Sequence, residues 1–404
     1  MTEQAKVPAI RFAGFTDPWE QRKASEVFQI VDDRGHPTLP VLSATQNQGM
    51  IYRDDSGRYI GHDESNEIGY KRVLPGDFVV HLRSFQGGFA HSQYEGITSP
   101  AYTVFRAKEP TSHSDRFWKH WFMSEHFIAG LSTVTYGIRD GRSISVDEFM
   151  NTFLAFPAVE EQAAISRLFD YLDDLITLHQ RKYDKLVILK KSMLEKMFPK
   201  DGESVPEIRF AGFTDPWEQR KLEDIANRVT RKNEGESDLP LTISSQYGLV
   251  DQRTFFNNQV ASKDMSGYYL LRKGEFAYNK STSGDSPWGA VKRLVRYEKG
   301  CVSTLYICFG LDGADPDFLV TYYETDRWYK AVQMIAAEGA RNHGLLNIAP
   351  NDFFDTALIL PPSREEQELI GLFFARLDNL ITLHQRKLEL LQNIKKSLLD
   401  KMFV

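Results

Sequence analysis

One phrase of seventeen residues occurs twice in this chain. The sequence "VPAIRFAGFTDPWEQRK" fills residues 7–23, and residues 205–221 repeat it with one substitution, 198 positions later. A second phrase, "LDDLITLHQRK" at residues 172–182, returns with one substitution at residues 377–387, at an offset of 205. Because the two offsets differ, the chain is predicted to contain two long units of one plan, with middle parts of unequal length.

Each unit is predicted to consist of the repeated phrase, a variable middle and a helical tail. The middles are rich in glycine, aromatic and β-branched residues in short alternating runs, such as "AYTVFRA" at residues 101–107 and "CVSTLYICFG" at residues 301–310. Alternation of this kind predicts strands, so the middles are expected to be small mixed α/β domains. The short polar segment "PKDGES" at residues 199–204 is the predicted connector between the units.

The two tails predict long helices. Proline stands just before each tail, the acidic triplet "EEQ" follows at residues 160–162 and 365–367, and lysines crowd both last turns. This polarity suits the helix dipole, and a helix of about 39 residues would be roughly 58 Å long. A coiled-coil seam is predicted from a 3–4 spacing. Its members are Ile165, Leu168, Leu172, Leu175, His179, Lys182, Leu186, Leu189 and Met193, and Ile370, Phe373, Leu377, Leu380, His384, Lys387, Leu391, Ile394 and Leu398.

Both predicted seams contain a polar break at the same place, which includes His179 in the first tail and His384 in the second. If the helices pair antiparallel, the two histidines come close together at the crossing centre. A register slip would then place an imidazole against leucine. The imidazole would be buried without a hydrogen-bond partner, which is unfavourable in free energy. We therefore expect His179 and His384 to fix the register. The alternative, in which both lie on a solvated edge, stays open here.

Composition narrows the functional classes. The chain has 404 residues, 42% of them hydrophobic, and no apolar run approaches the length of a membrane span, so no membrane partner is expected. The first ten residues lack a signal-peptide stretch, which predicts a cytoplasmic protein. The two cysteines, Cys301 and Cys308, cannot form a zinc site alone and imply no disulfide framework. The net charge of −6 gives no global sign of a nucleic-acid partner.

No catalytic motif is found in the chain. The sequence "LPPS" at residues 360–363 lacks the acid or amide that adenine methylation needs beside a flipped base. The acidic residues near residues 315–327 lack the spaced lysine of a metal-dependent nuclease, and there is no Walker A loop. We expect a non-catalytic protein with no cofactor and no metal site.

The doubled order of these features resembles the DNA-specificity subunits of Type I restriction–modification systems, the HsdS family. The resemblance covers nearly the whole chain. It depends on "RFAGFTDPWEQRK" at the start of each unit, on the strands that follow Gly76-Asp77 and Gly274-Glu275, and on the "EEQ" helix starts before long leucine-bearing helices. It implies an α+β fold. Two target-recognition domains in a pseudo-two-fold tandem repeat are separated by a long antiparallel two-helix coiled coil.

The resemblance also implies a domain division and partners. It predicts a first recognition domain, a first spacer helix, a connector, a second recognition domain and a second spacer helix, at residues 1–156, 157–198, 199–204, 205–360 and 361–404. The implied partners are double-stranded DNA with an asymmetric bipartite site, two methyltransferase (modification) subunits and, through them, the restriction/translocase subunits. Two alternatives stay open: a stand-alone pseudo-dimeric DNA-binding regulator and a coiled-coil scaffold whose middles bind protein.

Residues that read base edges are expected at loop tips, where Arg, Lys, Asn and Gln meet glycine-rich turns. Neither middle is strongly cationic, because residues 24–156 carry a net charge of −4 and residues 222–360 a net charge of −3. We therefore expect the isolated chain to bind DNA weakly. The candidate DNA-binding residues are Gln46, Asn47, Tyr52, Arg53, Arg83, Ser84, Gln86, Arg139 and Arg142 in the first unit, and Gln246, Tyr247, Gln252, Arg253, Asn279, Lys280, Ser281, Thr282, Ser283, Arg341, Asn342 and His343 in the second.

The repeated phrase itself is predicted to pack near a helix end in each unit. Its packing residues are expected to be Phe12, Phe15 and Trp19 in the first copy and Phe210, Phe213 and Trp217 in the second. An alternative role, contact with a partner subunit, is considered for Arg11, Arg22 and Lys23.

Overall fold

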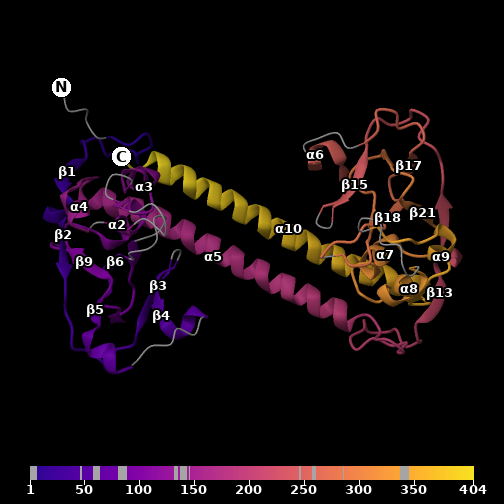
Figure 1. The fold of residues 1–404 in the computed structure, drawn as a ribbon, viewed down its shortest axis with the longest axis horizontal. Helices are drawn as coiled ribbons and strands as arrows, with labels where there is room; N and C mark the ends of the chain where they lie inside the picture. The colour runs from indigo at the N-terminus through magenta and orange to yellow at the C-terminus, as the bar shows by residue number, and fades with distance from the viewer. Residues whose placement is uncertain are drawn as a thin grey trace. The chain divides into compact units, whose positions relative to one another are not determined.

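The computed structural model of the chain describes residues 7–45, 48–57, 64–80, 89–131, 135–136, 143–144, 146–244, 247–256, 261–284, 286–336 and 345–404. The chain is divided into two compact units, each of which can be followed by colour in Figure 1. Unit 1 combines residues 1–180 with residues 386–404, and unit 2 runs from 181 to 385. Within the described residues, no helix has both the length and the apolar character that a membrane span requires.

Two helices of 38 residues, α5 (Val159–Lys196) and α10 (Arg364–Lys401), contribute to both units. The remaining elements of unit 1 are β1 (Glu20–Lys23), α1 (Ala24–Val27), β2 (Phe28–Val31), β3 (Leu42–Thr45), β4 (Gly49–Tyr52), η1 (Arg53–Ser56), η2 (Glu64–Gly69), β5 (Lys71–Val73), β6 (Phe78–Val80), β7 (Phe89–His91), β8 (Gly96–Thr98), β9 (Thr103–Ala107), α2 (Asp115–Trp121), α3 (Glu125–Leu131), β10 (Thr135–Tyr136), β11 (Ser143–Ile144), α4 (Val146–Asn151) and β12 (Phe153–Phe156).

Unit 2 repeats much of this order. Its elements are β13 (Glu218–Lys221), η3 (Leu222–Asp224), β14 (Ala226–Val229), β15 (Leu241–Ser244), β16 (Gly248–Asp251), α6 (Gln252–Phe256), β17 (Tyr269–Arg272), β18 (Phe276–Asn279), β19 (Ala290–Arg293), β20 (Lys299–Val302), β21 (Ile307–Leu311), α7 (Pro316–Tyr322), α8 (Tyr329–Ile335), α9 (Pro350–Phe354) and β22 (Ala357–Leu360). Mixed α/β units with long helices were expected from the sequence.

The central sheets of the two units have equivalent topologies. Unit 1 has a four-stranded antiparallel sheet in the order β2-β9-β6-β7, and unit 2 has one in the order β14-β21-β18-β19. The registers agree as well, because Phe78 lies opposite Phe105 and Phe276 lies opposite Phe309. Three two-stranded pairs also correspond, namely β1–β12, β3–β4 and β5–β8 in unit 1, and β13–β22, β15–β16 and β17–β20 in unit 2.

Aromatic packing builds the core of unit 1 against the start of α5. The Phe28 ring makes edge-to-face contacts with the rings of Phe105 and Trp118. The ring centroids are 5.2 Å apart for Phe28–Phe105 and 5.1 Å apart for Phe28–Trp118. The repeated-phrase residue Trp19 is buried, as predicted, and its ring meets that of Phe403 at 6.4 Å. The last residues of the chain therefore complete the core of the unit that contains the first ones.

The core of unit 2 is completed in the same way by the end of α5. Trp217, the second copy of the tryptophan, is buried and meets the Phe198 ring at 5.7 Å. The two "KMF" segments, at residues 196–198 and 401–403, thus fill equivalent places. The same backbone hydrogen bond accompanies both, from Ile10 N to Lys401 O and from Ile208 N to Lys196 O, each 2.9 Å long.

Bidentate ion pairs fix the start of each long helix to the repeated phrase. The Arg11 guanidinium donates from Nε and Nη2 to the Glu161 carboxylate, both at 2.7 Å, and Arg209 does the same to Glu366 at 2.6 and 2.8 Å. The carboxylates are almost fully buried, so each pair is shielded from solvent. Arg11, considered above as a partner contact, therefore has an internal role in unit 1.

Burial along the long helices follows a 3–4 spacing, and thirteen of the eighteen predicted seam positions are buried or partly buried. The five exposed positions are Lys182, Leu189, Leu380, Lys387 and Ile394. Leu189 and Leu380 of the predicted seam are 40% and 43% exposed. Adjacent apolar residues such as Leu380 and Ile381 give the sequence two possible seams, and of this pair only Ile381 is partly buried. Buried or partly buried positions that follow this spacing include Ile165, Phe169, Leu172, Ile176, His179, Tyr183, Leu186, Lys190, Met193 and Met197, and Ile370, Phe374, Leu377, Ile381, His384, Leu388, Leu391, Lys395, Leu398 and Met402.

Within each unit, the long helices run in opposite directions. In unit 1, Lys395 of α10 pairs with Asp173 of α5 at 2.5 Å, and Phe169, one turn earlier on α5, meets Phe403, two turns later in the chain. In unit 2, Lys190 pairs with Asp378 at 2.6 Å. His179 and His384 are both partly buried, and their role in the register stays a prediction.

Candidate nucleic-acid interface

The predicted DNA-binding residues that the structure describes lie at strand ends and in the segments that directly follow them. In the described part of unit 1, Tyr52 lies at the end of β4 and Arg53 lies at the start of η1. The described candidates of unit 2 are treated below. The candidates Gln46, Asn47, Arg83, Ser84, Gln86, Arg139, Arg142, Gln246, Arg341, Asn342 and His343 lie outside the described residues.

In unit 1, the two described candidates pack against aromatic rings. The Tyr52 ring lies 4.7 Å from that of Tyr94, and the Arg53 guanidinium carbon lies 6.0 Å from the centre of the Tyr70 ring. Two nitrogens of Arg53, Nε and Nη1, are buried and have no hydrogen-bond partner among the described residues. Stacking on a ring therefore holds this cation.

In unit 2, the β15–β16 hairpin places Tyr247 and Arg253 in different settings. Tyr247 lies at the turn and is 56% exposed. Arg253 is bound by the Asp251 carboxylate through Nε and Nη2, at 3.1 and 2.9 Å, and Gln252 precedes it at the start of α6. The hydrogen-bonding edge with which arginine reads a guanine is thus already occupied in Arg253.

Sequence reasoning missed an exposed aromatic pair beside these candidates. Phe255 and Phe256 are each 46% exposed on α6, with ring centroids 5.0 Å apart. The signal was present, since two phenylalanines follow one another within the polar stretch "DQRTFFNNQ". Phenyl rings of this kind contact thymine methyl groups or wedge between base steps in nucleic-acid complexes.

The β18–β19 connection brings the largest group of described candidates together. Asn279 ends β18, and its Oδ1 accepts the Ser281 backbone N–H at 3.1 Å. Ser281 forms a β-bridge with Leu345, and the Lys280 carbonyl accepts the Leu346 N–H at 3.0 Å. Two segments far apart in the sequence thus hold this end of β18 in place. Thr282 follows in the same connection.

A tight turn closes the same connection. Ser283 and Ser286 exchange two backbone hydrogen bonds of 3.1 Å, and Gly289 follows with φ of +83°. A Cβ atom at Gly289 would lie 2.3 Å from the Asn279 carbonyl oxygen. Glycine is therefore required where the returning strand passes the candidate residues.

An acidic residue braces the turn before each central strand, and it is buried in unit 1 and partly buried in unit 2. After Gly76 in unit 1, Asp77 accepts the Leu74 N–H at 2.7 Å and an Arg106 Nη2–H at 2.8 Å. Burial raises the pKa of Asp77, and its hydrogen bonds oppose that rise. In unit 2, Glu275 accepts from Arg231 Nη2 at 2.8 and 3.0 Å. These arginines were not among the sequence candidates.

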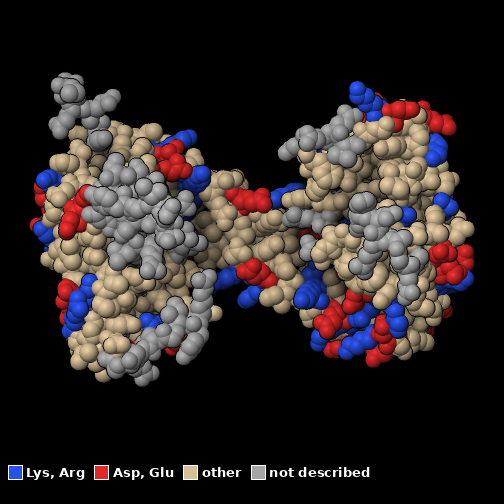
Figure 2. Space-filling model, viewed as in Figure 1, with Lys and Arg blue, Asp and Glu red and all other residues tan. Residues whose placement is uncertain are grey.

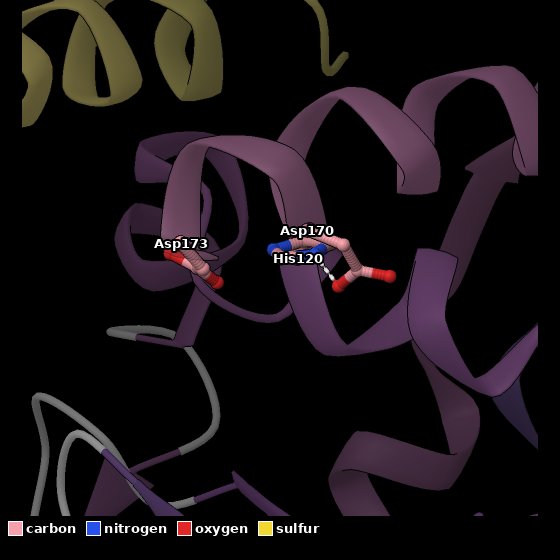
Figure 3. A group of neighbouring side chains, drawn as sticks. All are labelled: His120, Asp170 and Asp173. Carbon is pink, nitrogen blue, oxygen red and sulfur yellow. Dashed lines mark hydrogen bonds and ion pairs between the residues drawn. The ribbon is translucent and has the colours of Figure 1, made fainter. Parts of the chain in front are cut away.

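A cluster in unit 1 has the composition of a metal site. His120 of α2 and Asp170 and Asp173 of α5 lie side by side (Figure 3), with one potential ligand atom of each within 4.8 Å of the others. Burial alone would raise the pKa of Asp170, but the hydrogen bond from His120 and the nearby cations lower it to about 2. Burial lowers the pKa of His120.

The carboxylates of this cluster already have protein cations as partners. Lys119 lies 3.3 Å from Asp173, Lys395 lies 2.5 Å from the same carboxylate, and Arg116 lies 3.1 Å from Asp170. A metal ion would have to displace these groups, so the donor set fits a salt-bridged joint between α2 and the long helices better than a metal centre.

On the face of the molecule that is drawn (Figure 2), positive and negative side chains of the described residues are mixed rather than separated. On the face drawn in Figure 2, Lys and Arg residues alternate with Asp and Glu residues, and among the described residues on this face no broad basic field is visible. This agrees with the weak acidity of both middles. Long-range attraction of DNA, which depends on local concentration of positive charge, is therefore expected to be modest for the chain alone.

No protein-family model matches this chain. Comparison with solved structures, in contrast, gives a fold. The crystal structure of the Type I restriction–modification S subunit from M. genitalium is 11% identical, covers 98% of this chain and 99% of its own, and has a TM-score of 0.57. The HsdS subunit from Thermoanaerobacter tengcongensis is 15% identical, with 95% and 96% covered and a TM-score of 0.43. A chain from a structure of type I R-M complex assembly is 16% identical, with 95% and 97% covered and a TM-score of 0.45. The chain therefore shares the fold of the M. genitalium S subunit over nearly its whole length.

Proposed function

We propose that this chain is the non-catalytic DNA sequence-specificity subunit of a Type I restriction–modification complex. The observation that carries the proposal is the repetition of one framework with different loops. Both units have the same order of central strands and the same Arg–Glu anchor to a long helix, whereas the strand connections differ in sequence and length. The full-length likeness in fold to an S subunit supports the same reading.

In this proposal, the two units read two different half-sites. A protein with two similar readers on one framework binds two half-sites at a spacing that the framework fixes. Because the strand connections differ, the target should be asymmetric and bipartite, with an unread spacer. The recognition domains are residues 1–156 and 205–360, the spacer helices are residues 157–198 and 361–404, and residues 199–204 connect the halves. The helices form an antiparallel coil that separates the two domains.

The chemistry belongs to partner subunits in this proposal. Two methyltransferase subunits dock on the chain, and restriction/translocase subunits join through them. The mixed surface charge supports this division, since a reader with few free cations needs phosphate contacts from its partners. The M. genitalium structure is named for a subunit of such a system, which supports a complex rather than a stand-alone regulator or scaffold.

Mapping of N6-methyladenine in a genome that carries this chain and its methyltransferase partner tests the proposal. The expected result is one asymmetric motif with two read parts and a spacer of fixed length. Replacing residues 222–360 with the corresponding segment of another such chain should change one half of the motif and leave the other half and the spacer intact. A continuous palindromic motif, or no methylation that depends on this chain, would contradict the proposal.

A further inference from the structure

Lys280 differs from the arginines around the central sheet of unit 2. Arg231, Arg253 and Arg293 each pair with a carboxylate, at distances of 2.7–2.9 Å. Lys280 Nζ instead donates to a backbone carbonyl, that of Ile348, at 3.3 Å. Among the described residues, its ammonium group therefore has no neighbouring carboxylate as a partner.

The partial burial of this ammonium group has an energetic cost. Burial lowers the pKa of Lys280, and no charged neighbour contributes to that shift. A carbonyl dipole replaces only part of the hydration that a cation loses on burial, so such a group gains strongly from an added anion. Part-buried charges without a counter-ion are more common at binding sites than in structural cores.

The backbone around Lys280 is held in place. The lysine directly follows β18, an inner strand of the four-stranded sheet, and the Leu346 N–H binds its carbonyl. Asn279 and Ser281 on either side are joined by a side-chain hydrogen bond of 3.1 Å. A cation on such a support offers a defined position to a ligand, in contrast to a lysine on a free loop.

We propose that Lys280 binds a phosphate of the DNA backbone and thereby positions unit 2 on its half-site. This inference depends on the proposed function and assigns one role within it. A lysine ammonium acts as a point charge for phosphate, and contacts of this kind set the register of a protein on DNA without reading sequence. The exposed side chains of the same connection would then be left to meet base edges.

The contact is expected on one half-site only. The two central strands align in register through Phe78 and Phe276, which occupy equivalent positions opposite the neighbouring strand. Counting four residues forward gives Lys280 in the second unit and Leu82 in the first. The first unit therefore lacks a lysine at this place.

The test uses the chain in complex with its methyltransferase subunits, and duplexes that contain either the mapped target or an unrelated sequence. Lys280→Gln should weaken binding to both duplexes by the same factor and lower the slope of log K against log salt by about one. Lys280→Arg should restore most of the affinity, because it keeps the charge. Lys273→Gln is the matched control. Lys273 precedes the same strand, is 53% exposed and pairs with Glu298 at 2.6 Å, so its loss should leave binding unchanged.

Several results would overturn the inference. One is a Lys280→Gln complex with wild-type affinity and salt slope, and another is a loss confined to the target duplex with altered base preference, which would indicate base reading. A melting temperature equal to that of the wild type shows that Lys280→Gln is folded, and Lys280→Met provides a second neutral variant. If the wild-type complex itself shows no preference for its methylated motif, the proposed function fails, and this inference fails with it.

Discussion

Replacement of Phe403 by alanine at the end of the chain should destabilise the unit that contains the beginning of the chain. Phe403 is 1% exposed, and its ring contacts those of Trp19, Phe117 and Phe169 at 6.4, 5.7 and 5.6 Å. Removing a buried phenylalanine side chain costs about 3–5 kcal/mol, because burial is lost and a cavity is left. For a unit of about 200 residues, that corresponds to a fall in melting temperature of roughly 6–20 °C.

Hydrogen exchange measured by mass spectrometry separates the two units and is the assay of choice. In the Phe403→Ala protein, exchange should accelerate by about two orders of magnitude or more in the buried strands of residues 20–156. The strands of residues 218–360 should keep wild-type protection. Leu390→Ala, on the same helix but at a 59% exposed position, is the control and should change stability by less than about 0.5 kcal/mol. Unchanged protection in residues 20–156 of the Phe403→Ala protein would refute the packing argument.

Further predictions concern the anchors, the titrating groups and the turn. Arg209→Met should destabilise unit 2 by about 3–5 kcal/mol because it leaves the Glu366 carboxylate buried without its partner, and adding Glu366→Gln should recover part of that loss in chemical denaturation. Burial lowers the pKa of His113 and of His120 below the ordinary 6.5, so the folded protein favours their neutral forms. The unfolded chain binds these protons more tightly, and the stability of unit 1 should therefore fall as the pH drops below 6.5. Melting curves at pH 7.5 and 5.5 check this, and replacing both histidines by glutamine should flatten the difference. Gly289→Ala should cost more than about 1 kcal/mol and disturb DNA binding by the complex, since its φ is positive and a carbonyl fills the space for Cβ. Wild-type stability and affinity of the alanine variant would contradict this.

The sequence was sufficient to predict elements whose signals are local. The two helices of 38 residues followed from acid–base polarity and apolar spacing, and the burial of Trp19 and Trp217 followed from their place in the repeat. Five of the eighteen seam positions did not follow, because adjacent residues such as Leu380 and Ile381 both satisfy the spacing. Only the opposing surface decides which of two adjacent apolar side chains is buried.

The chemistry of the candidate site depends on contacts between segments far apart in the sequence. Lys280 is held by the carbonyl of Ile348, 68 positions away, and no local pattern predicts that partner. Arg253, in contrast, has a local partner, because the carboxylate of Asp251, two residues earlier, binds its guanidinium. The sequence "DQR" was sufficient to predict this ion pair. Sequence reasoning therefore did not distinguish cations that are paired with an acid in the structure from those that are not.

The seating of residues 401–403 in unit 1 has a consequence for biosynthesis. Residues 401–403 leave the ribosome more than two hundred positions after α5 has been made, a delay on the order of ten to forty seconds at about 5–20 residues per second. Until then, the aromatic core around Trp19 lacks the side chain that closes it. A prematurely terminated product would therefore carry a finished second half and an open first half, a state that protein quality control can detect through its exposed apolar surface.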